Sequence, residues 1–312
     1  MTMPETEDGL AWPRDFEARS AAGLDRAVIL GGGGLFLLAW HVAYLHEMHE
    51  HGIDLSAAPR VIGTSAGSVM AVGLTGGKLG RLHRMVGTLE KQPGIIDKLA
   101  PAGNPSPSQE RAREQFWFMP DTEPDTIRTV GHAALAARTP SADSTARTLG
   151  LLLGVRRWPS ESLHITCMDT FSGERCVITK ASGVSPSRAA AASSCVPGIF
   201  TPQPILDRKC MDGGVSWSGI HADLAAGAGH AVVLTLPKLE IEGLDLGDSV
   251  AANNPEAELA ELEATGTRVF HRTPEEADAT KLMDPVSVAA AFAMGKRQAQ
   301  GDVDELRSFL AG

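Results

Sequence analysis

The chain has 312 residues, of which 43% are hydrophobic and 21% are charged, so it has enough apolar side chains for a core and too little charge for a disordered protein. Its 28 basic and 38 acidic residues leave a formal net charge of −10, which disfavours nucleic-acid binding and provides no basic anchor for an anionic membrane. The first residues are polar and acidic and lack the apolar segment of a secretory signal. We therefore expect a cytoplasmic protein that contacts a membrane surface only transiently.

The composition along the chain suggests one main domain with two additions. Residues 1–24 are expected to form an N-terminal arm, and residues 25–312 a single domain. Residues 93–162 are rich in proline and scattered charges, which is typical of an insertion, and we expect a lid-like insertion there. The cysteines have no metal-ligand spacing, so we expect buried free thiols and no bound metal. They are Cys167, Cys176, Cys195 and Cys210.

The first regular elements lie in a run that resembles a membrane span. Residues 27–45 carry no formal charge over 19 positions, but four consecutive glycines at 31–34 interrupt them. Since glycine weakens a helix by about 1 kcal/mol relative to alanine, we expect a buried strand at 27–30, a tight turn, and a helix from about residue 38 to residue 50. A short apolar run at 59–62 then precedes the sequence GTSAG and a stretch of small residues. Two strand-turn-helix units in succession predict an α/β fold, with a mostly parallel central sheet between two helical layers.

Further elements follow from local patterns. A helical pattern covers residues 133–153, and apolar runs at 163–167 and 175–179, separated by Ser172-Gly173, predict a hairpin. Residues 231–236 predict another buried strand. Helical composition is found at 187–194, 255–264 and 287–310.

The motif Gly63-Thr64-Ser65-Ala66-Gly67 is the strongest local signal for chemistry. A serine at a sharp turn between a strand and a helix exposes its hydroxyl at the edge of the sheet, and the strained turn requires very small neighbours. Ser65 is therefore a candidate nucleophile, with Gly63 and Gly67 as the glycines that allow the turn. A structural turn is the alternative interpretation.

Glycines 31–34 form a second candidate component. Backbone amides at the carboxyl end of a strand can point together at a negatively charged oxygen. A phosphate-binding loop is disfavoured because Leu37 occupies the place of the third glycine of GxGxxG, and no Gly-Lys-Ser/Thr follows.

A nucleophilic serine needs a base, and the order of the motifs restricts the choice. Ser65 comes too early for an α/β-hydrolase, in which several strands normally precede the nucleophile. The candidate base is Asp212, which two glycines follow in Met211-Asp212-Gly213-Gly214. By itself an Asp-Gly-Gly sequence is more often an ordinary turn.

Together these motifs resemble the patatin-like phospholipases. The resemblance covers about residues 28–236 and comprises GGGG before a helix, GTSAG, AASSCVPGIFTP at 191–202 and MDGG, with MDTFSG at 168–173 between them. It implies the three-layer patatin-like fold and the hydrolysis of lipid esters by a Ser-Asp dyad without metal or organic cofactor. Ser65 would be the nucleophile, Asp212 its general base, and Gly32, Gly33 and Gly34 the oxyanion hole.

The expected function is therefore a serine acyl hydrolase that forms an acyl-enzyme and acts on lipid or other acyl esters. An acyltransferase using the same acyl-enzyme, and a degenerate acyl-binding protein, remain alternatives. His41, His221 or His230 could complete a triad, although a structural role is the simpler interpretation for each.

The chain departs from the family pattern at two places. Phe36 and Leu37 stand where the family commonly has arginine and glycine, and residues 215–220 replace a common asparagine and proline. The cluster Phe116-Trp117-Phe118 is expected either to contact an acyl chain or a bilayer surface, or to pack the insertion against the core.

Overall fold

The computed structural model describes residues 9–89, 99, 104–216, 219–239 and 255–312. Their elements in chain order are β1 (Arg26–Leu30), α1 (Gly34–Glu50), β2 (Arg60–Thr64), α2 (Ala66–Thr75), α3 (Leu79–Val86), α5 (Pro107–Trp117), α6 (Pro124–Ala136), α7 (Ala142–Leu153), β3 (Leu163–Asp169), β4 (Arg175–Ile178), η2 (Lys180–Ser182), α8 (Pro186–Ser193), β5 (Gln203–Ile205), β6 (Arg208–Asp212), η3 (Ala222–Ala225), β7 (His230–Leu234), α9 (Glu256–Ala264), β8 (Arg268–Arg272), η5 (Ala279–Lys281) and α10 (Ser287–Ala311).

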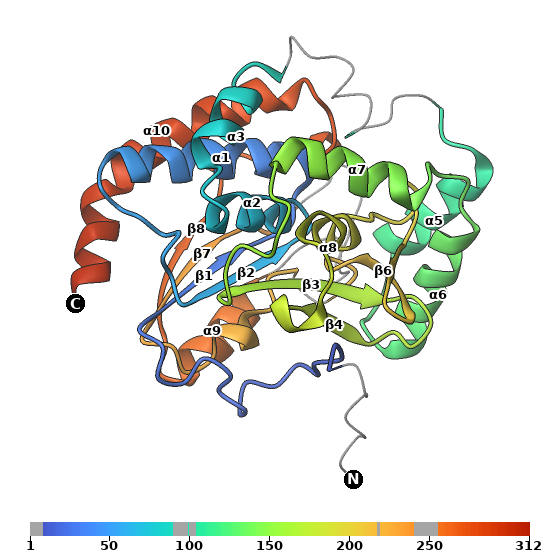
Figure 1. The fold of residues 1–312 in the computed structure, drawn as a ribbon, viewed down its shortest axis with the longest axis horizontal. Coiled ribbons are helices and arrows are strands. Elements are labelled where there is room, and N and C mark those ends of the chain that lie inside the picture. The colour runs from blue at the N-terminus through green and yellow to red at the C-terminus, as the bar shows by residue number, and fades with distance from the viewer. Residues whose placement is uncertain (1–8, 90–98, 100–103, 217–218, 240–254) are drawn as a thin grey trace.

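The strands of the described chain form one mixed sheet in the order β5-β6-β3-β2-β1-β7-β8, with β4 paired to β3. The five neighbouring strands β3, β2, β1, β7 and β8 run parallel, whereas β4 and β6 lie antiparallel to β3. Figure 1 shows α9 on the opposite side of the sheet from α1, α2 and α10. The predicted α/β fold with a mostly parallel sheet is thus confirmed.

Apolar side chains cover both faces of the sheet, as expected for parallel strands between helices. In β1, Val28 and Leu30 belong to the core beneath α1, α2, α8 and α10, whereas Ala27 and Ile29 belong to the core beneath η3 and α9. The alternation follows from the period of two residues in a strand. A third, smaller cluster around Met168 and Met211 lies beneath α5 and α6.

The uncharged run at 27–45 is strand, turn and helix, as expected, but the helix begins earlier than predicted. Helix α1 starts at Gly34 and its side chains are buried almost throughout. Within the described residues, no helix is long and apolar enough to cross a membrane. The predicted hairpin is confirmed as β3 and β4. The helical pattern at 133–153 is two helices, α6 and α7, with Pro140 between them.

The described part of the arm packs against the domain. Ala11 forms a bridge with Cys176 of β4, so the arm extends the sheet beside that strand. The expected insertion includes residues 93–98 and 100–103, which lie outside the described residues, and otherwise contains α5, α6 and α7. The division into arm, domain and lid-like insertion stays a prediction. All four cysteines are buried and free, as expected.

Candidate active site

Ser65 occupies a strained turn between β2 and α2. Its backbone angles are φ 51° and ψ −122°, a conformation that is rare for a residue with a side chain. The glycines on either side are required by close approach. A Cβ atom on Gly63 would lie 2.7 Å from the Gly67 carbonyl oxygen, and one on Gly67 would lie 1.9 Å from the Leu30 carbonyl oxygen. Gly63 therefore lets α2 pack directly on β2, and Gly67 lets it pack on the end of β1.

The sheet register brings Asp212 to Ser65. Thr64 of β2 is paired with Thr166 of β3, and the next residue of β3, Cys167, is paired with Asp212 of β6. The end of β6 is thus level with the residue after Thr64, two strand spacings of about 4.8 Å away. The side chains close this gap, and the Ser65 Oγ donates a hydrogen bond of 2.7 Å to Asp212 Oδ2.

The carboxyl of Asp212 lies in a dry environment, only 3% exposed. Its Oδ1 accepts a hydrogen bond of 2.7 Å from the Gly214 N–H. Burial raises the pKa of Asp212 to about 7, against the opposing effect of the hydrogen bonds from Gly214 and Ser65. A carboxylate with this pKa is a much better proton acceptor than an ordinary aspartate and is partly ionised near neutral pH.

Two of the three predicted oxyanion-hole glycines, Gly32 and Gly34, lie next to Ser65 or line its cavity. A Cβ atom on Gly32 would lie 3.0 Å from the Ser65 Cβ, so only glycine leaves room beside the hydroxyl. Gly34 has φ +60° and lines the same cavity as Ser65. Gly33 precedes the first helical residue of α1. Among the described residues, the N–H groups of these three glycines donate to no backbone carbonyl.

The residues that depart from the family pattern are part of the core. Phe36 and Leu37 are 6% and 0% exposed. The Phe36 N–H donates to the Leu282 carbonyl oxygen, and the Leu37 N–H donates to the Gly33 carbonyl oxygen. The glycine turn at 31–34 is thus followed by buried apolar side chains and backbone hydrogen bonds, at the place where the family commonly has an arginine.

Two serines that we did not single out from the sequence hold the backbone of Ser65 in place. The Ser65 N–H donates to Ser193 Oγ at 2.8 Å, and the Ser194 hydroxyl donates to the Ser65 carbonyl oxygen at 3.1 Å. Both lie in the segment 191–202 that carries the family resemblance. Their role could not be derived from the sequence, because it depends on α8 packing against α2.

An apolar cavity opens at Ser65. It has an empty volume of about 590 Å³, which includes space open to solvent. Its walls come from the start of α1, the start of α2, the inner side of α7 and the segment after α8. The lining side chains include Leu35, Leu38, Val69, Leu149, Leu152, Phe200 and Met283. The wall next to the Ser65 hydroxyl is therefore mostly apolar.

None of the three candidate histidines contacts Ser65 or Asp212. The His41 Nε2–H donates to the Leu234 carbonyl oxygen, and the His230 ring lies near Asp25 and Arg268. His221 contacts the carbonyl oxygen of Gly213, next to Asp212. The structure therefore does not bring a histidine into the dyad.

The aromatic cluster in the insertion lies elsewhere. Phe116 is partly buried against the apolar cluster beneath α5 and α6, whereas Phe118 is 55% exposed. Neither lines the cavity at Ser65. Packing of the insertion against the core thus accounts for Phe116. Among the described residues, no group of three or more His, Cys, Asp or Glu side chains is arranged to hold a metal ion.

Comparison with known families supports the resemblance seen in the motifs. Residues 28–226 match the family described as patatin-like phospholipase, which is more than half of the chain. The chain belongs to the patatin-like phospholipase family. Membership implies an ester hydrolase that acts on lipids. No curated protein sequence matches the chain.

Solved structures with detectable similarity are distant. VipD from Legionella pneumophila is 12% identical, with 96% of this chain and 69% of VipD covered and a TM-score of 0.38. The type III effector ExoU is 18% identical, with 90% of this chain and 53% of ExoU covered and a TM-score of 0.36. ExoU of Pseudomonas aeruginosa in complex with SpcU is 17% identical, with 88% of this chain and 53% of that chain covered and a TM-score of 0.33. The chain thus spans about half the length of ExoU.

The raised pKa of Asp212 predicts how stability depends on pH. In the unfolded chain its carboxyl ionises near 3.8 and in the folded protein near 7, so the folded state binds more protons between these values and stability falls as pH rises through this window. Asp212→Asn removes this titration. As pH rises from 4 to 8, we expect the unfolding free energy of the variant to increase relative to that of the parent, by a few kcal/mol at most.

Urea unfolding of both proteins across this pH range measures the difference. Comparison within each pH cancels the effects of all other titrating groups. A difference in unfolding free energy that stays constant from pH 4 to pH 8 would contradict the assignment of a raised pKa to Asp212.

Proposed function

We propose that the protein is a serine acyl hydrolase in which Ser65 is the nucleophile and Asp212 the general base. The observation that carries the proposal is the 2.7 Å hydrogen bond from the Ser65 hydroxyl to a buried carboxyl with a pKa of about 7. Burial keeps water from competing for the carboxylate, and the short contact aligns the proton transfer. The strained turn and the adjacent glycine amides support the same conclusion.

The reaction would begin with ionised Asp212. As the Ser65 Oγ attacks the ester carbonyl carbon, its proton moves to Asp212 Oδ2, and the negative charge develops on the carbonyl oxygen. The free N–H groups of Gly32, Gly33 and Gly34 would stabilise that oxyanion, with a contribution of about 3 kcal/mol per well-placed donor. Collapse of the tetrahedral intermediate expels the alcohol, which takes the proton from Asp212, and leaves an acyl-enzyme at Ser65.

Water would complete the cycle. It attacks the acyl carbon while Asp212 accepts its proton, and collapse returns a proton to the Ser65 Oγ and releases the carboxylic acid. The same acid-base group therefore acts in both halves. The apolar cavity at Ser65 supports an acyl chain as the part of the substrate that is bound, and lipid esters as the substrate class.

Single substitutions of the dyad test this function. We expect Ser65→Ala and Asp212→Asn each to lower the hydrolysis of a short-chain p-nitrophenyl ester by about a thousandfold or more, because each removes a reacting group. Ser187→Ala, in the first turn of α8 and outside the cavity, serves as the control and should keep full activity. Mass spectrometry after treatment with a fluorophosphonate should place the adduct on Ser65.

Three outcomes would change the proposal. Failure of the parent to react with both ester and probe would overturn it, and an adduct that survives Ser65→Ala would place the nucleophile elsewhere. An acyl-enzyme that discharges only when an alcohol acceptor is added would assign acyl transfer in place of hydrolysis.

A matched pair of substitutions on α7 tests the acyl cavity. Leu149 lines the cavity and is 5% exposed, whereas Leu151 is 76% exposed on the same helix. We expect Leu149→Trp to lower kcat/KM for a decanoyl ester by about tenfold more than for a butyryl ester, because the indole fills the cavity. Leu151→Trp should leave the ratio unchanged.

The ratio of the two esters is measured on the same preparation, so loss of folded protein does not affect it. Equal effects of Leu149→Trp on both esters would show that the acyl chain does not enter this cavity.

A further inference from the structure

The peptide group between Gly213 and Gly214 is held at both ends. Its N–H is the donor to Asp212 Oδ1, at 2.7 Å. Its carbonyl oxygen accepts from the Ser216 hydroxyl at 2.6 Å and contacts His221 Nε2 at 3.0 Å. Because a trans peptide is planar and its C=O and N–H point in opposite directions, fixing the carbonyl at one end fixes the direction of the N–H at the other.

The environment of His221 determines which ring nitrogen carries the proton. Its Nδ1 lies 3.5 Å from Arg175 Nη1. A guanidinium group can only donate, so Nδ1 is the acceptor and Nε2 carries the hydrogen that is donated to the Gly213 carbonyl. Burial, together with the positive charge of Arg175, lowers the pKa of His221 to about 4, and the ring is neutral at neutral pH.

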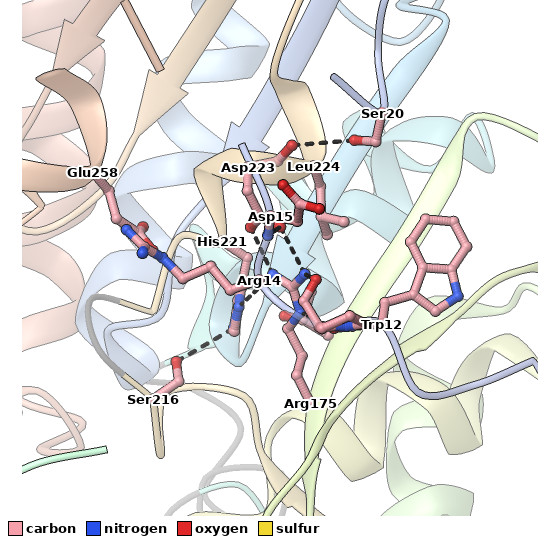
Figure 2. A network of polar contacts seen from close by, with 12 residues as sticks. Trp12, Arg14, Asp15, Ser20, Arg175, Ser216, His221, Asp223, Leu224 and Glu258 are labelled. Carbon is pink, nitrogen blue, oxygen red and sulfur yellow. Dashed lines mark hydrogen bonds and ion pairs between the residues drawn. The ribbon is translucent and has the colours of Figure 1, made fainter. Parts of the chain in front are cut away.

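A buried ion pair holds His221 in turn. The two nitrogens Nη1 and Nη2 of Arg175 donate to the two carboxylate oxygens of Asp223 at 2.6 and 2.7 Å. His221 directly precedes η3, which contains Asp223, and has φ 51° and ψ 52°, a left-handed conformation that persists only where its surroundings enforce it. Figure 2 shows the His221 ring between Ser216 and the guanidinium of Arg175.

The N-terminal arm completes this network. Arg175 donates to the carbonyl oxygens of Trp12 and Pro13 at 2.8 and 2.9 Å. The Asp15 N–H donates to Asp223 Oδ2 at 3.2 Å. These contacts satisfy the buried pair, as seen in Figure 2. The charged groups that act on His221 are therefore Arg175, Asp223 and Arg14, whose own partners are Glu258 and Glu261.

We propose that His221 is a positioning residue for Asp212, which acts through the peptide group between Gly213 and Gly214 and links the N-terminal arm to the dyad. The proposal goes beyond the assignment of the dyad and depends on the proposed function only for its effect on rate. Without the His221 donor, only the Ser216 hydroxyl holds the Gly213 carbonyl, and the N–H of the same peptide points less steadily at the carboxylate. The hydrogen bond that stabilises the ionised form of Asp212 is then weaker, and the pKa of Asp212 should rise.

Two substitutions of His221 by side chains of similar length separate this role from simple packing. Glutamine can place an amide N–H where the His221 Nε2–H lies, whereas methionine fills similar space without a donor. We expect His221→Met to raise the pKa of Asp212, measured by ¹³C NMR of labelled carboxyl groups, by about one unit. His221→Gln should restore most of the parent value. Asp212→Asn identifies the signal, and His230→Met is the matched control.

Kinetics provide a second readout on the same proteins. We expect His221→Met to lower kcat by about tenfold with KM for a short-chain ester nearly unchanged, and to move the rise of kcat with pH to higher pH. A packing defect alone would lower the amount of active enzyme, titrated with a fluorophosphonate, and would affect both variants equally.

The outcomes distinguish the proposal from the proposed function. If His221→Met shifts the Asp212 pKa but the parent protein has no esterase activity, the positioning role is supported and the proposed function is overturned. An unchanged pKa and kcat in His221→Met would overturn the positioning role alone. If His221→Met does not fold, His221→Leu is the second variant without a donor, and the same rise in the Asp212 pKa is expected. Its absence would overturn the proposal.

Discussion

The hydrogen bond between Ser65 and Asp212 depends on two strands that are far apart in the sequence and end at the same level of one sheet. β2 delivers Ser65 at its carboxyl end, and β6 delivers Asp212 from the antiparallel side of β3. A shift of one residue in either register would turn the side chain to the other face of the sheet. Both faces are covered by apolar cores, which leaves such a shift without a stable alternative.

Burial of this pair has opposite effects on stability and on chemistry. Placing a carboxyl where it is 3% exposed disfavours its ionised form, which costs stability above pH 4. The same burial makes the carboxyl basic enough to accept a proton from serine near neutral pH. In the proposed mechanism, a histidine is therefore not needed as the base. The ring of His221 contacts the carbonyl oxygen of Gly213, the residue after Asp212, and not the carboxyl itself.

The short-range motifs were predictable from the sequence because each has a local physical cause. The four glycines break the uncharged run, and a serine between two glycines marks a strained turn. The start of α1 was placed too late, since the glycine run, which disfavours a helix, continues to Gly34, the first helical residue. The segment from α5 to α7 was predicted only as an insertion, without its separate helices, and α6 and α7 were predicted as one helical pattern.

The contacts around the site could not be derived from the sequence, because they join elements that are far apart in the chain. Ser193 and Ser194 meet Ser65 only because α8 packs on α2, and the motif that contains them gave no indication of their partners. The wall that α7 contributes to the cavity was missed, and the aromatic residues that suggested a lipid contact lie elsewhere. His221 was considered as a third member of a triad, whereas the structure places it against the Gly213 carbonyl.

The rate at which a fluorophosphonate modifies Ser65, measured as a function of pH, tests the dyad most directly. Modification requires only the nucleophile and its base, so neither substrate binding nor deacylation affects the result. If Asp212 accepts the proton, the rate constant should rise with pH to a plateau, with a midpoint near 7, and should be low at every pH in Asp212→Asn. A rate that does not change between pH 5 and pH 9, or that is the same in Asp212→Asn, would contradict the assignment of Asp212 as the base.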